Sequence, residues 1–291
     1  APNTQTGKEA DNANIGDTIT YDIVADVPQY SASASAKNYA ISDSLPSGLT
    51  LNEGSIQVWG KSRQSETPLQ LTTDYAQSEE RPNSGGVSTF TLTFVYDQIS
   101  ACEKIHIQYT AVLNSEAALG ETGNVNTAYL DYGQDDNSWK MYSDSANVYT
   151  YGLDVNKVDE DDNSVLLPGA QFELYASQED AVSGDNKIQF VMTEKGEYRR
   201  ALSTDTVESI GTTLTVGDGT DSVQGNLIVR GLDEGTWYLK EITAPEGYNL
   251  LTNPIAVTIK DAADATNVLD GKVESAKGST GEDVALVTLT V

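Results

Sequence analysis

Short stretches in which apolar residues occupy every second position constrain this chain more than any other feature of its sequence. A period of two places successive side chains on opposite faces of a β-strand, so that one face is buried and the other is solvated. Polar turn segments such as 82–86 (PNSGG) and 134–137 (QDDN) separate the stretches, and no long amphipathic helix is predicted. The pattern is typical of antiparallel all-β domains. The clearest alternating stretches are 19–27, 90–96, 105–113 and 124–132.

The length of the chain and its strand pattern predict an all-β fold with two tandem β-sandwich domains. A chain of 291 residues is long for one small sandwich and sufficient for two, each with a hydrophobic core of its own. A domain boundary is expected near residues 149–152, because a new alternating strand begins at Leu153 and an acidic turn follows it. We therefore expect one domain at residues 1–150 and a second at residues 151–291. Further strands of the second domain are expected at 166–175, 227–229, 236–242, 255–259 and 284–291.

The composition excludes several classes of function. The formal net charge of −27, from 44 acidic and 17 basic residues, would repel nucleic acid over most of the surface. A single cysteine, Cys102, rules out an intrachain disulfide, and the one histidine, His106, is expected on an outward strand face. No metal site, cofactor or histidine-based triad is therefore predicted. No apolar run is as long as a membrane span and no signal peptide opens the chain, so we expect a mature or excised fragment.

Polar side chains occupy strand positions that the alternation assigns to the buried face. They are Lys157 and Glu241 in the second domain, and Asp43, Asn124 and Asn126 in the first. Burying a charge without a partner is costly, so each of these groups is expected to meet another polar group. The simplest interpretation is an ordinary salt bridge between Lys157 and Glu241, with the remaining groups reaching solvent at strand ends.

A covalent reaction is the alternative interpretation. Burial disfavours the charged forms of both a lysine and a carboxyl group, so the amine can be neutral while a nearby carboxyl keeps its proton. The protonated carboxyl can hydrogen-bond an asparagine carboxamide and polarise its carbonyl. Attack by the amine then expels ammonia and leaves an amide. Because neither reactant diffuses, well-oriented intramolecular reactions reach effective molarities of about 10⁵ M or more. Such a reaction is a single turnover and needs no cofactor.

The second domain contains a motif that closely resembles one found in a known family. Residues 237–248, WYLKEITAPEGY, resemble the E-box of pilins and collagen-adhesin B-type domains of Gram-positive bacteria, in which an aromatic residue, a leucine and a glutamate precede Ala-Pro-x-Gly-Tyr. Residues 153–159 (LDVNKVD) and 167–175 (LPGAQFELY) match the same family. The resemblance implies an immunoglobulin-like sandwich in which Lys157 is the nucleophile and Glu241 is the catalytic carboxyl.

The acceptor of the second domain is left open by the sequence. In the resembling domains it is an asparagine at the end of the last strand, whereas residues 284–291 contain no asparagine. Val287, Leu289 and Val291 form the expected inward face of this strand, so the next inward position would follow Val291. Either the acceptor lies beyond this sequence or the second domain forms no bond.

The first domain resembles the middle domain of the same pilins. The resemblance implies an immunoglobulin-like sandwich in which Lys8 is the nucleophile, Asp43 the catalytic carboxyl and Asn126 the acceptor of an isopeptide bond. Asn124 lies on the same strand face two residues earlier and is the second candidate for the acceptor. The segments that carry the resemblance are 15–21 (IGDTITY), 41–49 (ISDSLPSGL), 109–114 (YTAVLN) and 123–128 (GNVNTA).

This resemblance implies a structural role outside the cell. We expect the shaft subunit of a pilus that is anchored to the cell wall and that supports adhesion and colonisation. Sortase would join neighbouring pilin subunits covalently, and the sortase lysine motif and the sorting signal are expected outside this sequence. The protein would not be an enzyme beyond its own single-turnover crosslinking. The sequence indicates neither the organism nor a host ligand.

Two other functions compete with this interpretation. Similar modules build the stalks of surface adhesins and ancillary or tip pilins, which an additional ligand-binding domain would distinguish. A calcium- or carbohydrate-binding sandwich is disfavoured. The acidic turns at 135–137 and 159–163 lack the regular ligand spacing of a calcium loop, and no pair of carboxylates with aromatic platforms marks a sugar cleft.

Overall fold

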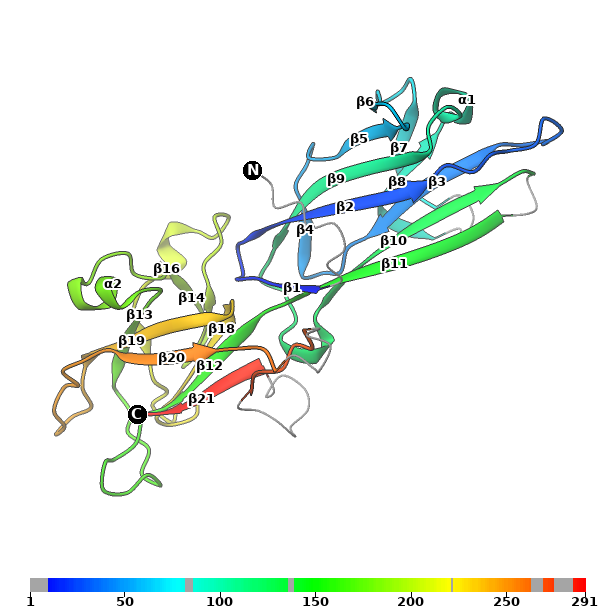
Figure 1. The fold of residues 1–291 in the computed structure, drawn as a ribbon. Helices are drawn as coiled ribbons and strands as arrows, with labels where there is room; N and C mark the ends of the chain where they lie inside the picture. The colour runs from blue at the N-terminus through cyan, green and yellow to red at the C-terminus, as the bar shows by residue number, and fades with distance from the viewer. Residues whose placement is uncertain (1–9, 82–85, 136–138, 221, 263–268, 275–284) are drawn as a thin grey trace. The chain divides into compact units, whose positions relative to one another are not determined.

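The computed structural model consists of strands and connecting loops with very little helix (Figure 1). The described residues form two compact units, and each unit is made of segments that are not contiguous in the sequence. None of the helices in these residues is long and apolar enough to span a membrane. The structure describes residues 10–81, 86–135, 139–220, 222–262, 269–274 and 285–291.

The first unit comprises Thr18–Val112 and Asn124–Asn147. Its elements are β2 (Thr18–Asp26), β3 (Asn38–Ser44), β4 (Leu49–Leu51), β5 (Gln57–Lys61), β6 (Glu66–Pro68), β7 (Tyr75–Glu80), β8 (Val87–Phe94), α1 (Tyr96–Ile99), β9 (Lys104–Leu113), β10 (Asn124–Gly133) and β11 (Trp139–Tyr149). One sheet has the order β2-β9-β5-β6, with β4 pairing β9. The other has the order β11-β10-β3-β8-β7, and β1 (Ala10–Asn12) continues it beside β11.

Apolar side chains from both sheets fill the core of the first unit. Burial alternates residue by residue along β9, and Ile105, Ile107 and Tyr109 are fully buried. Phe90 of β8 packs edge-on against Tyr109, with ring centroids 5.1 Å apart, and so joins the two sheets. The β-sandwich predicted from the alternation is confirmed for this unit.

Strand β3 lies in the middle of its sheet and is buried on both faces. The sequence predicted only one buried face, the one that carries Ile41 and Asp43. The opposite face is covered as well, and Ser42 there is fully buried with its hydroxyl 2.9 Å from the Thr91 hydroxyl. Because β3 pairs with β10 on one side and with β8 on the other, Asp43 is held away from solvent.

The second unit comprises Ala10–Asp17, Leu113–Gly123 and Val148–Val291. Besides β1, its elements are η1 (Gly120–Thr122), β12 (Tyr151–Asn156), β13 (Gln171–Tyr175), α2 (Gln178–Ser183), β14 (Phe190–Glu194), β15 (Glu197–Arg200), η2 (Val207–Ser209), β16 (Ile210–Gly211), β17 (Leu214–Thr215), β18 (Asn226–Leu232), β19 (Gly235–Thr243), β20 (Ile255–Ile259) and β21 (Leu286–Thr290). One sheet has the order β16-β14-β15-β18-β12-β21 and the other the order β17-β13-β19-β20.

Strand β21 fixes the position of the chain next to Lys157. It runs parallel to β12, and Val291 N–H donates to the Asn156 carbonyl at 2.9 Å while Val158 N–H donates to the Val291 carbonyl at 2.8 Å. Leu289 and Val291 pack against the hydrophobic core, as their inward positions predicted. The end of β21 therefore lies beside Lys157.

Two segments from the first half of the chain complete the second unit. Ile15 N–H donates to the Gly231 carbonyl at 3.0 Å, and Leu119 packs in the hydrophobic core of the unit. The Tyr151 hydroxyl lies 2.8 Å from Asn12 Oδ1 and 2.6 Å from Asp261 Oδ2. These contacts explain why the compact units are not contiguous stretches divided near residue 150.

Most expected strands are present, and two differ at their ends for local reasons. Strand β13 begins at Gln171 rather than at residue 166, since Pro168 cannot donate to a ladder and Gly169 has a φ of 86°. The strand expected at 90–96 ends at Phe94, and Tyr96 begins the short helix α1. By contrast, β20 has the predicted bounds.

Candidate functional site

A buried carboxyl group and a buried carboxamide meet inside the first unit. Asp43 comes from β3 and Asn126 from β10, and these strands pair antiparallel. Asn126 Nδ2 donates to Asp43 Oδ2 at 3.1 Å and to the Tyr109 hydroxyl at 2.6 Å. The Tyr109 side chain also hydrogen-bonds Asp43. Three side chains from both sheets therefore converge at one point of the core.

The environment of Asp43 favours its neutral form. Its side chain is fully buried, and only 4% of Asn126 is exposed. Burial raises the pKa of Asp43 to about 7, although the hydrogen bonds from Tyr109 and Asn126 act in the opposite direction. A carboxyl group with this pKa exists in both protonation states near neutral pH, so it can give and accept a proton there.

Two oxygen atoms of this cluster are buried without a hydrogen-bond partner among the described residues. They are Asp43 Oδ1 and Asn126 Oδ1. Buried acceptors are normally satisfied, and an unsatisfied one costs about 1 to 3 kcal/mol. A donor that entered the cluster, such as a lysine amine, would relieve this cost.

The predicted nucleophile, Lys8, lies outside the described residues. Strand β1 begins shortly after it, at Ala10, and pairs with β11, the neighbour of β10 in the sheet. Asn124 is buried on β10 as well, but the hydrogen bond to Asp43 is made by Asn126. The structure thus brings Asp43 and Asn126 together, and the roles assigned to them and to Lys8 stay predictions.

The alternation of β10 changes partway along the strand. Asn126 is buried as expected, whereas Leu130 is only half buried and Asp131 is fully buried instead. A nitrogen of the Arg81 guanidinium lies 3.5 Å from Asp131 Oδ2. An alternating pattern of apolar residues cannot predict that a charged residue is buried against a partner distant in the sequence. The predicted inward face of β10 was therefore wrong beyond residue 127.

Lys157 and Glu241 face each other in the second unit. Lys157 Nζ is 3.9 Å from Glu241 Oε1, and the two side chains are 9% and 0% exposed. Glu241 Oε2 accepts from Leu251 N–H at 2.8 Å, while Oε1 is buried without a hydrogen-bond partner among the described residues. Lys157 Nζ donates to the Val291 carbonyl at 3.4 Å. The predicted burial of both residues is confirmed, and the amine is directed at the end of β21.

His106 lies on the outer face of β9, as predicted. Its Nε2 is 2.8 Å from Asp22 Oδ1 and its Nδ1 is 2.8 Å from Glu66 Oε1. Burial opposes the charged imidazole, but the hydrogen bonds and charges of Asp22 and Glu66 outweigh it and raise the pKa of His106. The described residues contain no group of three or more His, Cys, Asp or Glu side chains placed to hold a metal ion. His106 therefore connects the carboxylates of Asp22 on β2 and Glu66 on β6.

Replacing His106 with glutamine should change how the stability of the first unit depends on pH. Because the folded-state pKa is raised, protonation of His106 stabilises the fold fully in acid, and this contribution is lost as the pH rises through the folded pKa. In thermal melts at increasing pH, from about pH 5 to about pH 9, the free energy of unfolding of the wild type should exceed that of His106→Gln by about 1 kcal/mol or less in acid. This difference should disappear at high pH. An advantage that grew with pH would contradict the pairing with Asp22 and Glu66.

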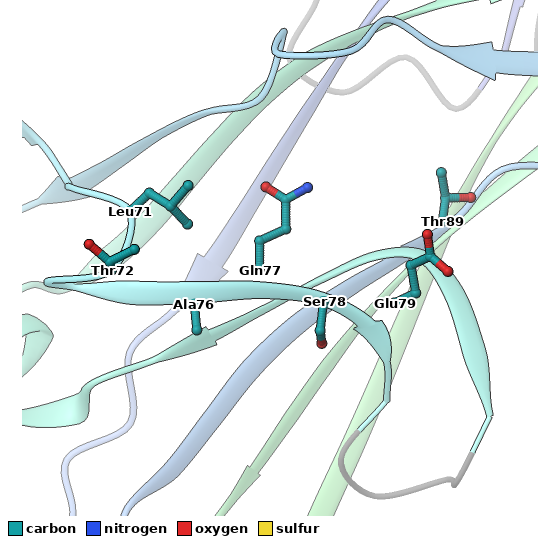
Figure 2. Close-up of a pocket in the computed structure, with 7 residues that line it drawn as sticks. All are labelled: Leu71, Thr72, Ala76, Gln77, Ser78, Glu79 and Thr89. Atoms are coloured by element: carbon teal, nitrogen blue, oxygen red, sulfur yellow. The ribbon is translucent and has the colours of Figure 1, made fainter.

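A surface hollow beside β7 carries no comparable chemistry. Figure 2 shows Gln77 projecting from one face of β7 while Ala76 and Ser78 project from the other, so the lining side chains do not converge. Glu79 is the only charged side chain of the lining and is exposed. The hollow is lined by Leu71, Thr72, Ala76, Gln77, Ser78, Glu79 and Thr89.

Two protein-family models match the chain, one on each side of residue 150. The model described as Gram-positive pilin backbone subunit 2, Cna-B-like domain, matches residues 15–136. The model described as SpaA, prealbumin-like fold domain, matches residues 152–272. Residues 15–136 therefore belong to a domain family of the Gram-positive pilin backbone. The family named from the two motif sets in the sequence is therefore confirmed.

Individual relatives of this pilin chain agree with that assignment. The trypsin-resistant surface T6 protein of Streptococcus pyogenes serotype M6 is 26% identical over 265 residues, which cover 84% of the chain and 42% of that protein. The solved T6 backbone pilin of the same serotype is 25% identical, with a TM-score of 0.61, and the match covers 85% of the chain and 48% of that structure. The pilin chain thus spans less than half the length of these T6 relatives.

Another solved pilin matches over nearly its whole length. The pilus 2b backbone protein of group B streptococcus is 25% identical, with a TM-score of 0.67, and the match covers 96% of this chain and 94% of that structure. The full-length major pilin RrgB from Streptococcus pneumoniae is 16% identical with a TM-score of 0.60, over 100% of this chain and 72% of that structure. The latter likeness shows a shared fold.

Proposed function

We propose that this chain is part of the shaft subunit of a covalently polymerised pilus on the surface of a Gram-positive bacterium. The family models and the backbone pilins of similar sequence and fold support this role. Neighbouring pilin subunits, joined by sortase, are its partners, and its location is the extracellular, cell-wall-anchored pilus. The chain contributes a stable structural module that supports adhesion, and no cofactor takes part.

The first unit forms an isopeptide bond between Lys8 and Asn126 in this proposal. The observation that carries it is the buried hydrogen bond from Asn126 Nδ2 to Asp43 Oδ2, next to two buried oxygens to which no described residue donates. Force that enters near Lys8 would then pass through a covalent bridge to β10 and bypass most of the hydrogen-bonded strands between them. Such a module carries tension without unfolding.

The reaction consumes the two side chains and nothing else. The neutral Lys8 amine attacks Asn126 Cγ, and the protonated form of Asp43, which is populated because burial raises its pKa to about 7, supplies the proton that the leaving nitrogen takes up. Asp43 then takes a proton from the attacking amine, ammonia leaves, and an Nζ–Cγ amide remains. The step is intramolecular and runs once in each molecule, so the protein is not an enzyme in the turnover sense.

The second unit supports the same chemistry with Lys157 as the nucleophile and Glu241 as the carboxyl. The amine lies 3.9 Å from Glu241 Oε1 and donates to the Val291 carbonyl at the end of β21. Residues 285–291 contain no asparagine, so an acceptor for Lys157 would come from outside this stretch.

Substitution of the acceptor tests the proposal in the first unit. Asn126→Ala should abolish the loss of ammonia that accompanies folding of the first unit, whereas Asn124→Ala should leave it intact, since the contact with Asp43 is made by Asn126. Intact-protein mass spectrometry measures the loss, and a proteolytic peptide map should locate a branched peptide that contains Lys8 and Asn126. A branched peptide through Asn124 would reassign the acceptor. A wild-type protein with its full unreacted mass would overturn the bond altogether.

A further inference from the structure

We propose that Tyr109 is a further catalytic residue of the crosslinking reaction, which orients the Asn126 carboxamide and delivers a proton to its departing nitrogen. This inference rests on the isopeptide bond proposed above. Its basis is the position of the Tyr109 hydroxyl, which accepts from Asn126 Nδ2 at 2.6 Å and hydrogen-bonds Asp43. The hydroxyl thus touches the atom that must leave and the carboxyl that must supply the proton.

Tyr109 is held rigidly where this contact is made. Its ring is fully buried at an inward position of β9. Tyr21 stacks on it with centroids 5.2 Å apart and an interplanar angle of 16°, and Phe90 packs against it edge-on. A ring clamped on two sides cannot turn its hydroxyl away, so the position of that oxygen is fixed before any reaction.

The hydroxyl decides which end of the carboxamide faces Asp43. Both N–H bonds of Asn126 Nδ2 are used, one toward Asp43 and one toward Tyr109. Asn126 Oδ1 is consequently turned to the other side, where no described residue donates to it. This orientation places the leaving nitrogen against the acid. Without the hydroxyl, one N–H would lose its acceptor and the amide could rotate by half a turn.

In the proposed reaction, the proton for the leaving nitrogen passes through the Tyr109 hydroxyl. The amine forms a bond to Asn126 Cγ while the carbonyl electron pair moves to Oδ1. The Tyr109 hydroxyl gives its proton to Nδ2 and regains one from the Asp43 carboxyl in the same relay. The Cγ–Nδ2 bond breaks, the electron pair returns from Oδ1, and ammonia departs. The Asp43 carboxylate then recovers a proton from the new amide nitrogen. Burial raises the pKa of Tyr109, so its hydroxyl keeps its proton and is available as a donor.

Packing alone does not explain a tyrosine at this position. The neighbouring inward residues of β9, Ile107 and Ala111, are apolar and fully buried. A hydroxyl buried among them would be costly unless it were bonded, and its partners among the described residues are the two groups of the proposed reaction. Tyr39 offers a matched control, because its hydroxyl is equally deep in the same unit but donates to the Asp26 backbone carbonyl at 3.2 Å.

The test compares Tyr109→Phe with Tyr39→Phe in the full chain. Each variant removes one buried hydroxyl and keeps the ring. The wild type and Tyr39→Phe should be isolated fully crosslinked, lighter by one ammonia in intact-protein mass spectra. Tyr109→Phe should be isolated with a large unreacted fraction, which decreases only during later incubation. Equal crosslinked fractions in the two freshly isolated variants would overturn the role of Tyr109, while the isopeptide bond would remain supported. Absence of the ammonia loss in the wild type would overturn both proposals.

A second measurement separates catalysis from a general loosening of the core. Protein that also carries Lys8→Ala cannot react, and in it the Asn126 side-chain amide should be observable by NMR. The two Nδ2 protons should be protected from exchange when Tyr109 is present and should exchange at least about ten-fold faster in the Tyr109→Phe background. Unchanged protection, with a normal melting temperature, would show that the hydroxyl does not hold the amide and would contradict the proposal.

Discussion

Replacement of Asp43 by alanine should yield a protein that retains the ammonia lost by the wild type and unfolds at a much lower temperature. Asp43 is the carboxyl that contacts Asn126, and its pKa of about 7 suits it to move protons near neutral pH. A crosslink from Lys8 to Asn126 closes a long loop and so lowers the entropy of the unfolded chain. For a loop of this size, the folded state should be stabilised by on the order of 4 to 5 kcal/mol. The melting temperature of the first unit should therefore fall by about 10 °C or more. Mass spectrometry and calorimetry measure the two effects.

Two companion variants separate the chemistry of Asp43 from its packing. Asp43→Asn keeps the shape of the side chain but can neither give nor accept a proton as an acid or base near neutral pH, so it should also fail to release ammonia. Asp26→Ala removes a carboxylate whose side chain is 81% exposed and paired with Lys104, so it should keep both the bond and the melting temperature. Complete crosslinking in Asp43→Asn would refute proton transfer by this carboxyl.

The regular part of the fold could be predicted because each strand buries one face. In β9, alternation of apolar and polar residues predicts which side chains face the core, and Ile105 and Ile107 are fully buried there. The same reasoning located Asp43, Asn126, Lys157 and Glu241, since each is a polar residue at an inward position. The roles of these residues as nucleophile, carboxyl or acceptor came from the family resemblance, because alternation predicts only which face a residue is on.

Other features depend on contacts between residues distant in the sequence. Leu119 belongs to the core of the second unit although it precedes most of that unit by many residues. Asp131 is buried because Arg81 pairs with it, and nothing local signals this partner. In the sequence, Tyr109 is part of the matching segment 109–114, and nothing in that segment indicates a partner for its hydroxyl. Its contact with Asn126 becomes visible only when both sheets are in place.

Glu241→Ala should destabilise the second unit by about 3 to 5 kcal/mol, as expected when one member of a buried charge pair is removed. The substitution leaves the Lys157 amine buried without its partner at 3.9 Å and deprives Leu251 N–H of its acceptor. Urea unfolding of the chain, followed by a probe in the second unit, measures the loss. A matched pair is Lys187 and Glu173, 2.6 Å apart, in which the lysine is 36% exposed, so Glu173→Ala should cost less.

A double-mutant cycle then asks why the Lys157–Glu241 pair is present. Lys157→Met and Glu241→Leu replace both groups with apolar side chains of similar size, and such a replacement is often neutral or stabilising even where each single change is costly. We expect the double variant to cost less stability than the sum of the two single variants, by about 2 kcal/mol or more, a coupling energy typical of residues in direct contact. Additive effects would mean that the two groups act independently, against the geometry. If the double variant folds as stably as the wild type, the pair is not needed for stability, which would agree with the crosslinking role proposed for Lys157 and Glu241.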